Sequence, residues 1–191
     1  MAVLPVIKYG DPILGRKTQP LDDFSIPKLQ DLVQNMFDTM YEEEGIGLAA
    51  NQVGVDLNLM VIDITHVSQS GEMSPEEGQP NPKEFDRPLV FANGEILEGW
   101  GGNAMEEGCL SLPGIRVDVE RFEGVRFGFQ ELSGDPPRIS YGKRRVEKFQ
   151  GLLARVIQHE MDHLNGLVIV DRVSSLMRQQ FSQQLKQIAS H

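Results

Sequence analysis

The sequence predicts an α+β fold in which mostly antiparallel strands surround a central metal-binding helix, with an N-terminal helix and a C-terminal helix beside it. Two patterns support this class. Apolar residues recur at intervals of three and four in separate segments, as they do on one face of a helix. β-Branched and aromatic residues alternate through the middle of the chain, as in half-buried antiparallel strands. A chain of 191 residues can bury one core without disulfides, and we expect residues 1–191 to form a single domain.

The first part of the chain is expected to contain one helix and one buried strand. The apolar spacing favours a helix from residue 26 or 27 to about residue 41, and Pro27 suits its first turn. The glycine-rich segment 45–52 ends that helix, and residues 57–64 have the β-branched composition of a strand. Residues 66–88 hold many prolines, glycines and glutamates, so we expect an exposed loop insertion there.

Strands are expected to dominate the middle of the chain. The segments 89–97 and 115–132 have strand composition and are separated by glycine-rich turns, and 138–146 can add another strand. Apolar residues alternate with others in the second of these segments, which favours half-buried antiparallel pairing; they are Val117, Val119, Val125, Phe127 and Phe129.

The last part of the chain is expected to hold the central helix and a shorter one. The central helix runs from about residue 148 to 165, is apolar nearly all round and is therefore buried, and Gly166 would end it. A short strand over 168–170 and a C-terminal helix over 174–191 complete the predicted order.

Composition excludes several classes of function. A formal net charge of −10 argues against non-specific binding to nucleic acid, which needs a basic surface. One cysteine allows no internal disulfide and fits a reducing compartment. We find neither a secretory leader nor an apolar run of membrane-spanning length, so we expect a cytoplasmic protein without a membrane partner.

Two histidines on the central helix give the strongest sign of function. His159 and His163 are four residues apart, so both imidazoles lie on one helical face and can bind one metal ion. Glu160 would be costly to bury in so apolar a helix unless a cation lay beside it. A glutamate there can also act on water at the metal, so the motif predicts metal-assisted hydrolysis rather than two ordinary helical histidines.

Cys109 is the best candidate for a third metal ligand. A catalytic metal commonly has three protein ligands. Downstream of the histidines, the chain offers only the terminal His191 and Asp171, which soon follows a glycine turn. Cys109 lies in the segment 106–113, where a glycine and a proline indicate a specially shaped backbone. The alternatives are a small buried apolar residue or a nucleophilic thiol served by a histidine.

A third unusual segment, residues 45–52, reads Gly-Ile-Gly-Leu-Ala-Ala-Asn-Gln. Taken alone, it is a helix terminator followed by small residues that pack closely. Beside a metal site, its glycines would let an extended ligand approach the backbone. Gln52 would then offer an amide donor to a developing oxyanion.

Together, these three segments resemble the motifs of the peptide deformylase family. Residues 45–52 are similar to its first motif, 107–111 match its second and 158–163 match its third. The motifs occur in the family's order, and similarity extends from Val6 through Arg172. The family's substrate is the N-formyl-methionyl end of a nascent polypeptide, and its products are formate and a free N-terminus.

The resemblance implies a role for each motif residue. Cys109, His159 and His163 would hold the metal, and Glu160 would be the catalytic acid and base. Gln52 and the backbone N–H of Leu110 would bind the oxygen of the tetrahedral intermediate. The remaining implied residues bind substrate: Ile46 and Gly47 would pair with the peptide as an added strand, and Leu152 and Val156, with Ile46, would wall the methionine pocket.

Metal and partner are also implied by the resemblance. A thiolate with two imidazoles fits zinc by ligand chemistry, whereas the family implies Fe(II), often displaced by zinc, nickel or cobalt on isolation. The C-terminal helix is locally basic at Arg172, Arg178 and Lys186, which could serve ribosome contact or could simply be a solvated face.

Three positions depart from the familiar pattern, and two other functions remain open. Asn51 stands at a variable position of the first motif where proline or another residue is more usual. Residues 90–94 replace a strand that usually ends in Asn-Pro, and Arg155 lies near the pocket where an apolar residue is common. The first rival function is a metalloprotease, which shares the two-histidine helix. The second is a non-catalytic metal-binding module.

Overall fold

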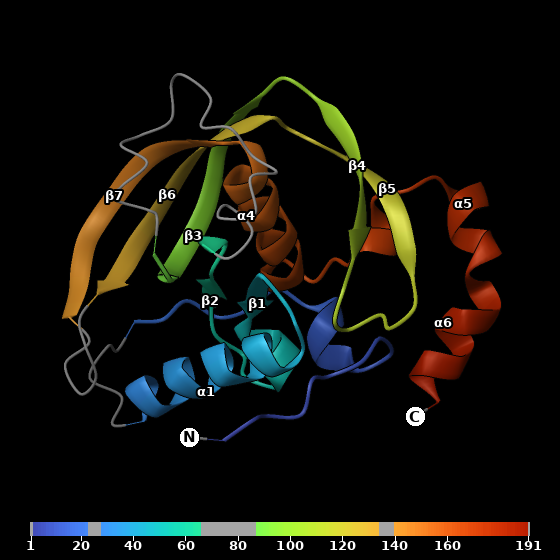
Figure 1. The fold of residues 1–191 in the computed structure, drawn as a ribbon, viewed down its shortest axis with the longest axis horizontal. Helices are drawn as coiled ribbons and strands as arrows, with labels where there is room; N and C mark the ends of the chain where they lie inside the picture. Colours follow the sequence, from blue (N-terminus) through green and yellow to red (C-terminus); the bar gives the residue numbers. More distant parts are fainter. Residues whose placement is uncertain (1, 23–27, 66–86, 134–139, 191) are drawn as a thin grey trace.

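A five-stranded antiparallel sheet is the framework of the fold (Figure 1). The structure is a computed structural model that describes residues 2–22, 28–65, 87–133 and 140–190. Its strands follow the order β1-β2-β3-β6-β7, and each pairs antiparallel with its neighbour. The bounds are β1 Gly47–Ala49, β2 Leu59–Ile62, β3 Leu89–Trp100, β6 Gly124–Ser133 and β7 Ser140–Gln150.

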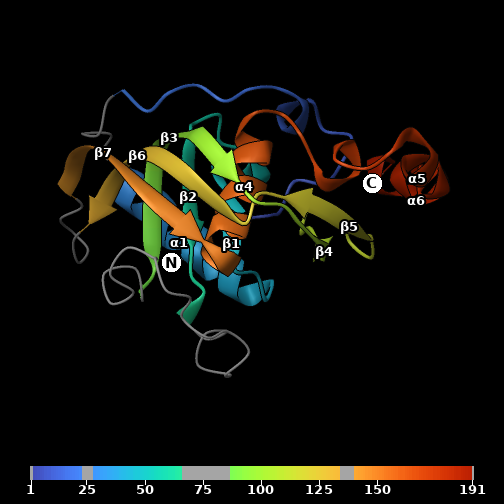
Figure 2. The same cartoon turned by 90° about the horizontal axis from the view of Figure 1, so that it is seen from above.

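A separate antiparallel hairpin carries the second motif. Strand β4 (Asn103–Gly108) pairs with β5 (Arg116–Arg121), in a register from Asn103↔Arg121 to Gly108↔Arg116. The hairpin lies between α4 and the C-terminal helices in both views (Figures 1 and 2). Since β4 ends at Gly108, the connection between the two strands begins with Cys109.

The central helix α4 (Gly151–Leu164) packs on the five-stranded sheet. It begins at the residue after β7, where Gly151 has a φ of +62°, and the Gly151 N–H donates to the Glu123 carbonyl at 3.0 Å. Its apolar side chains meet a group of four aromatic rings that are all buried: Phe91, Phe127, Phe129 and Phe149. The predicted buried helix is therefore confirmed, although residues 148–150 belong to β7 instead.

Helix α1 (Leu29–Glu42) covers strands β1 and β2 and forms a second apolar core. Its inward face includes Met36 and Met40, both fully buried, and its other face is polar. Truncating either methionine to alanine would cost about 2–5 kcal/mol, the usual range for such core residues. Residues 23–27, where the sequence predicts the start of this helix, lie outside the described residues, and so does most of the predicted insertion at 66–88.

The C-terminal part differs from the prediction in two ways. The predicted strand over 168–170 is wrong, because a 3-10 turn (η3, Ile169–Asp171) forms there and the Asp171 carboxylate accepts the Val168 N–H at 2.9 Å. The single predicted helix is two helices, α5 (Ser175–Gln180) and α6 (Ser182–Ala189), which meet at Phe181. Leu185 anchors α6 in a third apolar cluster against the β4–β5 hairpin connection.

Two short strands were not expected from the sequence. Strands β1 and β4 fall in the segments 45–52 and 103–108, which have few residues with high strand propensity. Two 3-10 turns, η1 (Pro12–Gly15) and η2 (Ala50–Val53), complete the described elements. Within the described ranges, no helix combines the length and apolarity needed to cross a bilayer.

Candidate active site

The three predicted metal ligands come together between the hairpin and α4. The candidate ligand atoms of Cys109, His159 and His163 all lie within 4.8 Å of one another. Cys109 Sγ is 3.1 Å from His163 Nε2, and the two imidazole ring centroids are 5.1 Å apart. A thiolate and two imidazoles that converge in this way fit a divalent transition metal and leave a coordination position for a small molecule.

Electrostatics favour the metal-binding form of Cys109. Burial would raise the pKa of the thiol, but the imidazoles of His163 and His159 outweigh burial and hold that pKa well below its ordinary value. The thiolate is the form that binds metal. The site therefore favours the anionic form of this ligand.

Glu107 fixes the orientation of His159. Its Oε2 lies 2.9 Å from His159 Nδ1, and Arg121 donates to both carboxylate oxygens at 2.6 and 2.8 Å. Burial would raise the pKa of Glu107, but the bonds from His159 and Arg121 overcome it and hold the pKa far below its usual range. An ionised carboxylate only accepts hydrogen bonds, so Nδ1 carries the proton and Nε2 is left for a metal.

The ion pair extends into a buried network that joins the hairpin to α4. Arg121, whose side chain is only 3% exposed, also donates to Asp162 at 2.9 Å. Asp162 in turn accepts from Arg172 Nε at 2.9 Å. From α4, Arg155 donates to Glu107 at 2.7 Å and to the Val119 carbonyl at 3.1 Å. Arg155 also lines the cavity, and its guanidinium group is paired.

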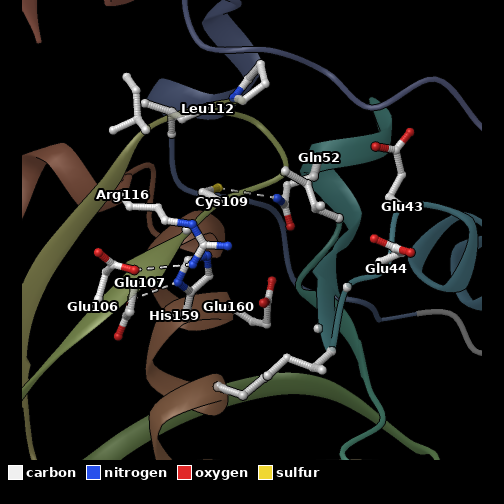
Figure 3. A pocket seen from close by; sticks show the side chains of 18 of the residues that line it. Glu43, Glu44, Gln52, Glu106, Glu107, Cys109, Leu112, Arg116, His159 and Glu160 are labelled. Atoms are coloured by element: carbon white, nitrogen blue, oxygen red, sulfur yellow. Dashed lines mark hydrogen bonds and ion pairs between the residues drawn. The ribbon is translucent and has the colours of Figure 1, made fainter.

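Glu160 points into the cavity from the helix turn that carries the histidines (Figure 3). Glu160 is only 3% exposed, and its Oε2 has no hydrogen-bond partner among the described protein atoms. Burial raises the pKa of this carboxyl above its ordinary value. A raised pKa suits a group that must take up and return a proton near neutral pH.

Gln52 is held in a fixed orientation opposite Glu160 (Figure 3). Its Oε1 accepts the Ala49 N–H at 2.8 Å, so its Nε2 must face the other way. Nε2 lies 3.2 Å from Ser111 Oγ and 3.9 Å from Cys109 Sγ. The amide donor is therefore directed toward the ligand group, and Leu110 lines the same cavity one residue after Cys109.

Asn51, one of the departures from the family pattern, has a structural role. Its Nδ2 donates to the His163 carbonyl at 2.6 Å, and the residue is fully buried. The first motif is therefore tied directly to the helix that carries the ligands. A proline at this position could not make that bond.

A cavity of about 620 Å³ opens over these groups. All four predicted substrate residues, Ile46, Gly47, Leu152 and Val156, line it. Strand β1 is an edge strand of its sheet among the described residues, which suits pairing with an extended peptide. Sequence reasoning missed several other lining residues: Lys8, Glu43, Glu44, Met105, Leu112 and Arg116.

Sequence reasoning also missed the part that Glu107 plays. One signal was available: a carboxylate two residues before the cysteine, in a segment that must approach two histidines. Its partners Arg121 and Arg155 come from other elements, so the sequence gives no local sign of them.

The fold and site define the class as a metal-dependent hydrolase, with a Cys/His/His ligand group and a buried glutamate beside it. The chain belongs to the polypeptide deformylase family, whose model matches residues 3–179. Among similar proteins, peptide deformylase 2 of Xanthomonas campestris pv. campestris is 39% identical over 193 residues, which cover 100% of this chain and 99% of that protein. The peptide deformylase of Aquifex aeolicus is 40% identical over 176 residues, covering 92% and 90%.

Solved structures agree with this assignment. The structure is similar to peptide deformylase from Thermus thermophilus, with a TM-score of 0.79 and 32% identity, covering 99% of each chain. It is also similar to a peptide deformylase from Legionella pneumophila, with a TM-score of 0.76 and 35% identity, covering 97% of this chain and 95% of that one. The expected α+β deformylase fold is thus confirmed.

Proposed function

We propose that this protein removes the formyl group from the N-terminal formyl-methionine of newly made polypeptides and releases formate. The observation that carries the proposal is the buried Glu160 carboxylate, which points into the cavity beside the Cys109, His159 and His163 group. Strand β1 lies directly beside Glu160 at Gly47, and the side chain of Gln52 lines the same cavity. Hydrolysis of an amide at the end of an extended peptide uses each of these features.

In the proposed mechanism, Cys109, His159 and His163 hold the divalent ion. When bound, the ion supplies Lewis acidity, which polarises the formyl carbonyl and makes water more acidic. Glu160 takes a proton from the attacking water and later gives it to the departing amine nitrogen. The Gln52 amide and the Leu110 N–H donate to the oxygen on which negative charge develops, and one such donor often contributes roughly 10²–10³-fold in rate.

Substrate would bind as an added strand. The backbone at Ile46 and Gly47 pairs with the peptide, while Ile46, Leu152 and Val156 contact the methionine side chain. A methyl group added at Gly47 would collide with Glu160, so strand β1 lies directly against that carboxylate. A peptide paired with β1 would bring its acyl end close to Glu160, where formyl, the smallest acyl group, is favoured over acetyl on steric grounds.

Of the divalent ions, we propose Fe(II) as the physiological metal, with zinc, nickel or cobalt possible in purified protein. The family resemblance supports iron, while the donor set alone suits zinc equally well. Metal analysis of protein purified anaerobically in parallel with protein purified in air would test this. Iron absent from both preparations would contradict it.

A cytoplasmic location and contact with the ribosome follow as further proposals. Nascent chains arise at ribosomes, and a thiolate ligand such as Cys109 needs a reducing compartment. The basic surface of the C-terminal helices is smaller than the sequence suggests, because Arg172 pairs with Asp162 and Arg178 with Asp171. Since Leu185 is buried, we would test contact by Lys186→Glu rather than by deletion, and unchanged cosedimentation with ribosomes would argue against it.

The activity itself is tested with two matched substrates. Formyl-Met-Ala-Ser should yield formate about 100-fold faster than acetyl-Met-Ala-Ser yields acetate, because one extra carbon in a confined site is worth roughly 10–200-fold. Glu160→Ala should keep the metal and lose hydrolysis. Equal rates on the two substrates, or no formate, would overturn the proposal. Retained hydrolysis in Glu160→Ala would instead refute the assigned role of that residue.

A further inference from the structure

Residues 7–9, which we call the N-terminal strap, run between the two segments that carry the proposed oxygen-binding donors. The Ile7 N–H donates to the Gln52 carbonyl at 2.7 Å. The Tyr9 N–H donates to the Ser111 carbonyl at 2.9 Å. Between them, Lys8 Nζ donates to the Leu110 carbonyl at 2.9 Å. Three successive residues thus bind both segments.

We propose that Lys8 is a positioning residue that holds the Leu110 backbone, and with it the Leu110 N–H, in the geometry needed to receive the substrate oxygen. This inference rests on the proposed function for its catalytic consequence. It concerns a residue outside all three motifs, 102 positions away from its partner along the chain.

The connection after β4 explains why the Leu110 backbone needs an external contact. Cys109 and Leu110 belong to a turn in which the Leu112 N–H donates to the Cys109 carbonyl at 2.9 Å. This bond fixes the carbonyl of Cys109 and the amide of Leu112, but it leaves the peptide unit between Leu110 and Ser111 to other partners. Lys8 supplies a partner for that unit, and a bond from a cationic donor is about twice as strong as a neutral one.

The Leu110 N–H belongs to the same peptide unit as the Cys109 carbonyl, which accepts the Leu112 N–H. Lys8 binds the following peptide unit. Because the two units meet at the Cα of Leu110, holding both planes restrains the φ and ψ of Leu110 and with them the direction of its N–H. A donor that is free to rotate must be ordered at the moment of reaction, whereas a donor held beforehand needs no reorganisation. Lys8 is half-buried and lines the cavity, so its contact is made at the site and not on the outer surface.

The second donor is reached by the same strap. Gln52 is 59 positions from Ser111 in the chain, and the two residues are already joined at 3.2 Å by their side chains. The strap binds their main-chain carbonyls through Ile7 and Tyr9. Backbone and side-chain contacts therefore set the spacing between the two donors together.

The experiment compares Lys8→Met, Lys8→Arg and Lys17→Met with the wild type. Methionine keeps most of the stem and removes the donor, arginine keeps both charge and donor, and Lys17 is an exposed lysine of the same N-terminal region. Each protein is loaded with zinc, and we measure metal content, kcat and KM for formyl-Met-Ala-Ser, thermal stability, and amide hydrogen exchange at Leu110 by NMR.

We expect Lys8→Met to lower kcat about tenfold, equivalent to about 1.4 kcal/mol, with KM changed less than about threefold. Metal content should remain that of the wild type, and exchange at the Leu110 amide should become faster. Lys8→Arg should recover most of kcat and slow exchange again, and Lys17→Met should match the wild type.

A kcat for Lys8→Met within about twofold of the wild type, with unchanged Leu110 exchange, would overturn the proposal. A loss of kcat that simply follows a loss of metal, or that arginine does not restore, would overturn it as well. Wild-type protein that releases no formate would contradict the proposed function instead. In that case the Leu110 exchange comparison still decides whether Lys8 holds this backbone.

Discussion

Adding one methyl group at Gly47 should displace the proposed catalytic carboxylate. A Cβ built on Gly47 would lie 2.5 Å from Glu160 Oε1 and 2.8 Å from Val156 Cγ1. An ordinary contact between carbon and oxygen is about 3.4 Å, so the carboxylate of Gly47→Ala must withdraw by roughly 0.9 Å. Misplacement of about 1 Å can cost 10²-fold in rate. We therefore expect kcat to fall about 100-fold, equivalent to about 2.7 kcal/mol in activation free energy.

The same substitution should leave the rest of the protein nearly intact. Gly47 lies in a strand with ordinary φ, where alanine gains about 0.5–1 kcal/mol over glycine, and this gain offsets part of the crowding against Val156. Formate release, metal content and urea unfolding would be measured on Gly47→Ala and on Gly15→Ala, whose Cβ meets nothing within 4 Å. A kcat within about threefold of the wild type, or a loss of activity explained by lost metal, would refute the reasoning.

The remaining predictions concern the buried ion-pair network of Glu107, the bound metal, and Tyr41 near the C-terminal end of α1. Glu107→Gln should weaken metal binding about 10–100-fold and lower the free energy of unfolding by about 3 kcal/mol, because it leaves buried guanidinium groups without their counter-charge. Chelator competition and urea unfolding test this against Glu98→Gln, whose exposed pair with Arg126 should contribute less than about 1 kcal/mol. Removing metal with a chelator should abolish formate release and lower the free energy of unfolding, by about 4 kcal/mol for a metal present at 1,000 times its Kd, and added Co²⁺ should reverse both effects. Tyr41→Phe removes the 2.6 Å bond to Asp63 and should cost about 1 kcal/mol at neutral pH, since the ring is partly exposed. Burial, followed by the bond to Asp63, raises the pKa of Tyr41 above its ordinary value of 10.0, so this stabilisation is complete below pH 10 and declines above it. A wild-type advantage in Tm that is equal at pH 8 and pH 11 would contradict that account.

Regular patterns made the long elements predictable. The spacing of apolar residues located α1 and α4, and alternation located β5 and β6, because their side chains contact a core that is continuous along the element. Strand β1 has only the residues Gly-Leu-Ala and exists because it pairs with β2. The β-branched residues at 168–170 favour a strand, but the Asp171 cap gives them a turn. In both cases contacts with other parts of the chain, and not local propensity, determine the secondary structure.

The ligand group was predictable for a different reason. His159, Glu160 and His163 are close in sequence and lie on one helix, so their relative positions can be predicted from helix geometry alone. Cys109 could be inferred only by excluding worse candidates and by resemblance. The contacts of Arg121 with Asp162, or of Lys8 with Leu110, span 41 and 102 positions. Their formation depends on how the hairpin docks, which no local pattern describes.

Helix α4 follows β7 without a linker, and this fixes the direction in which each of its side chains points. Because Gly151 follows the strand at once and its N–H is bound to Glu123, the helix has no linker that could absorb a change in length. Each residue of a helix turns the chain by about 100°, so one residue inserted between Gly151 and His159 would rotate every side chain beyond it by that angle. His159 and His163 would turn away from Cys109 together. Sequence length is therefore under tighter constraint in this stretch than side-chain identity, and a family member with an insertion here would need a compensating deletion before its first histidine.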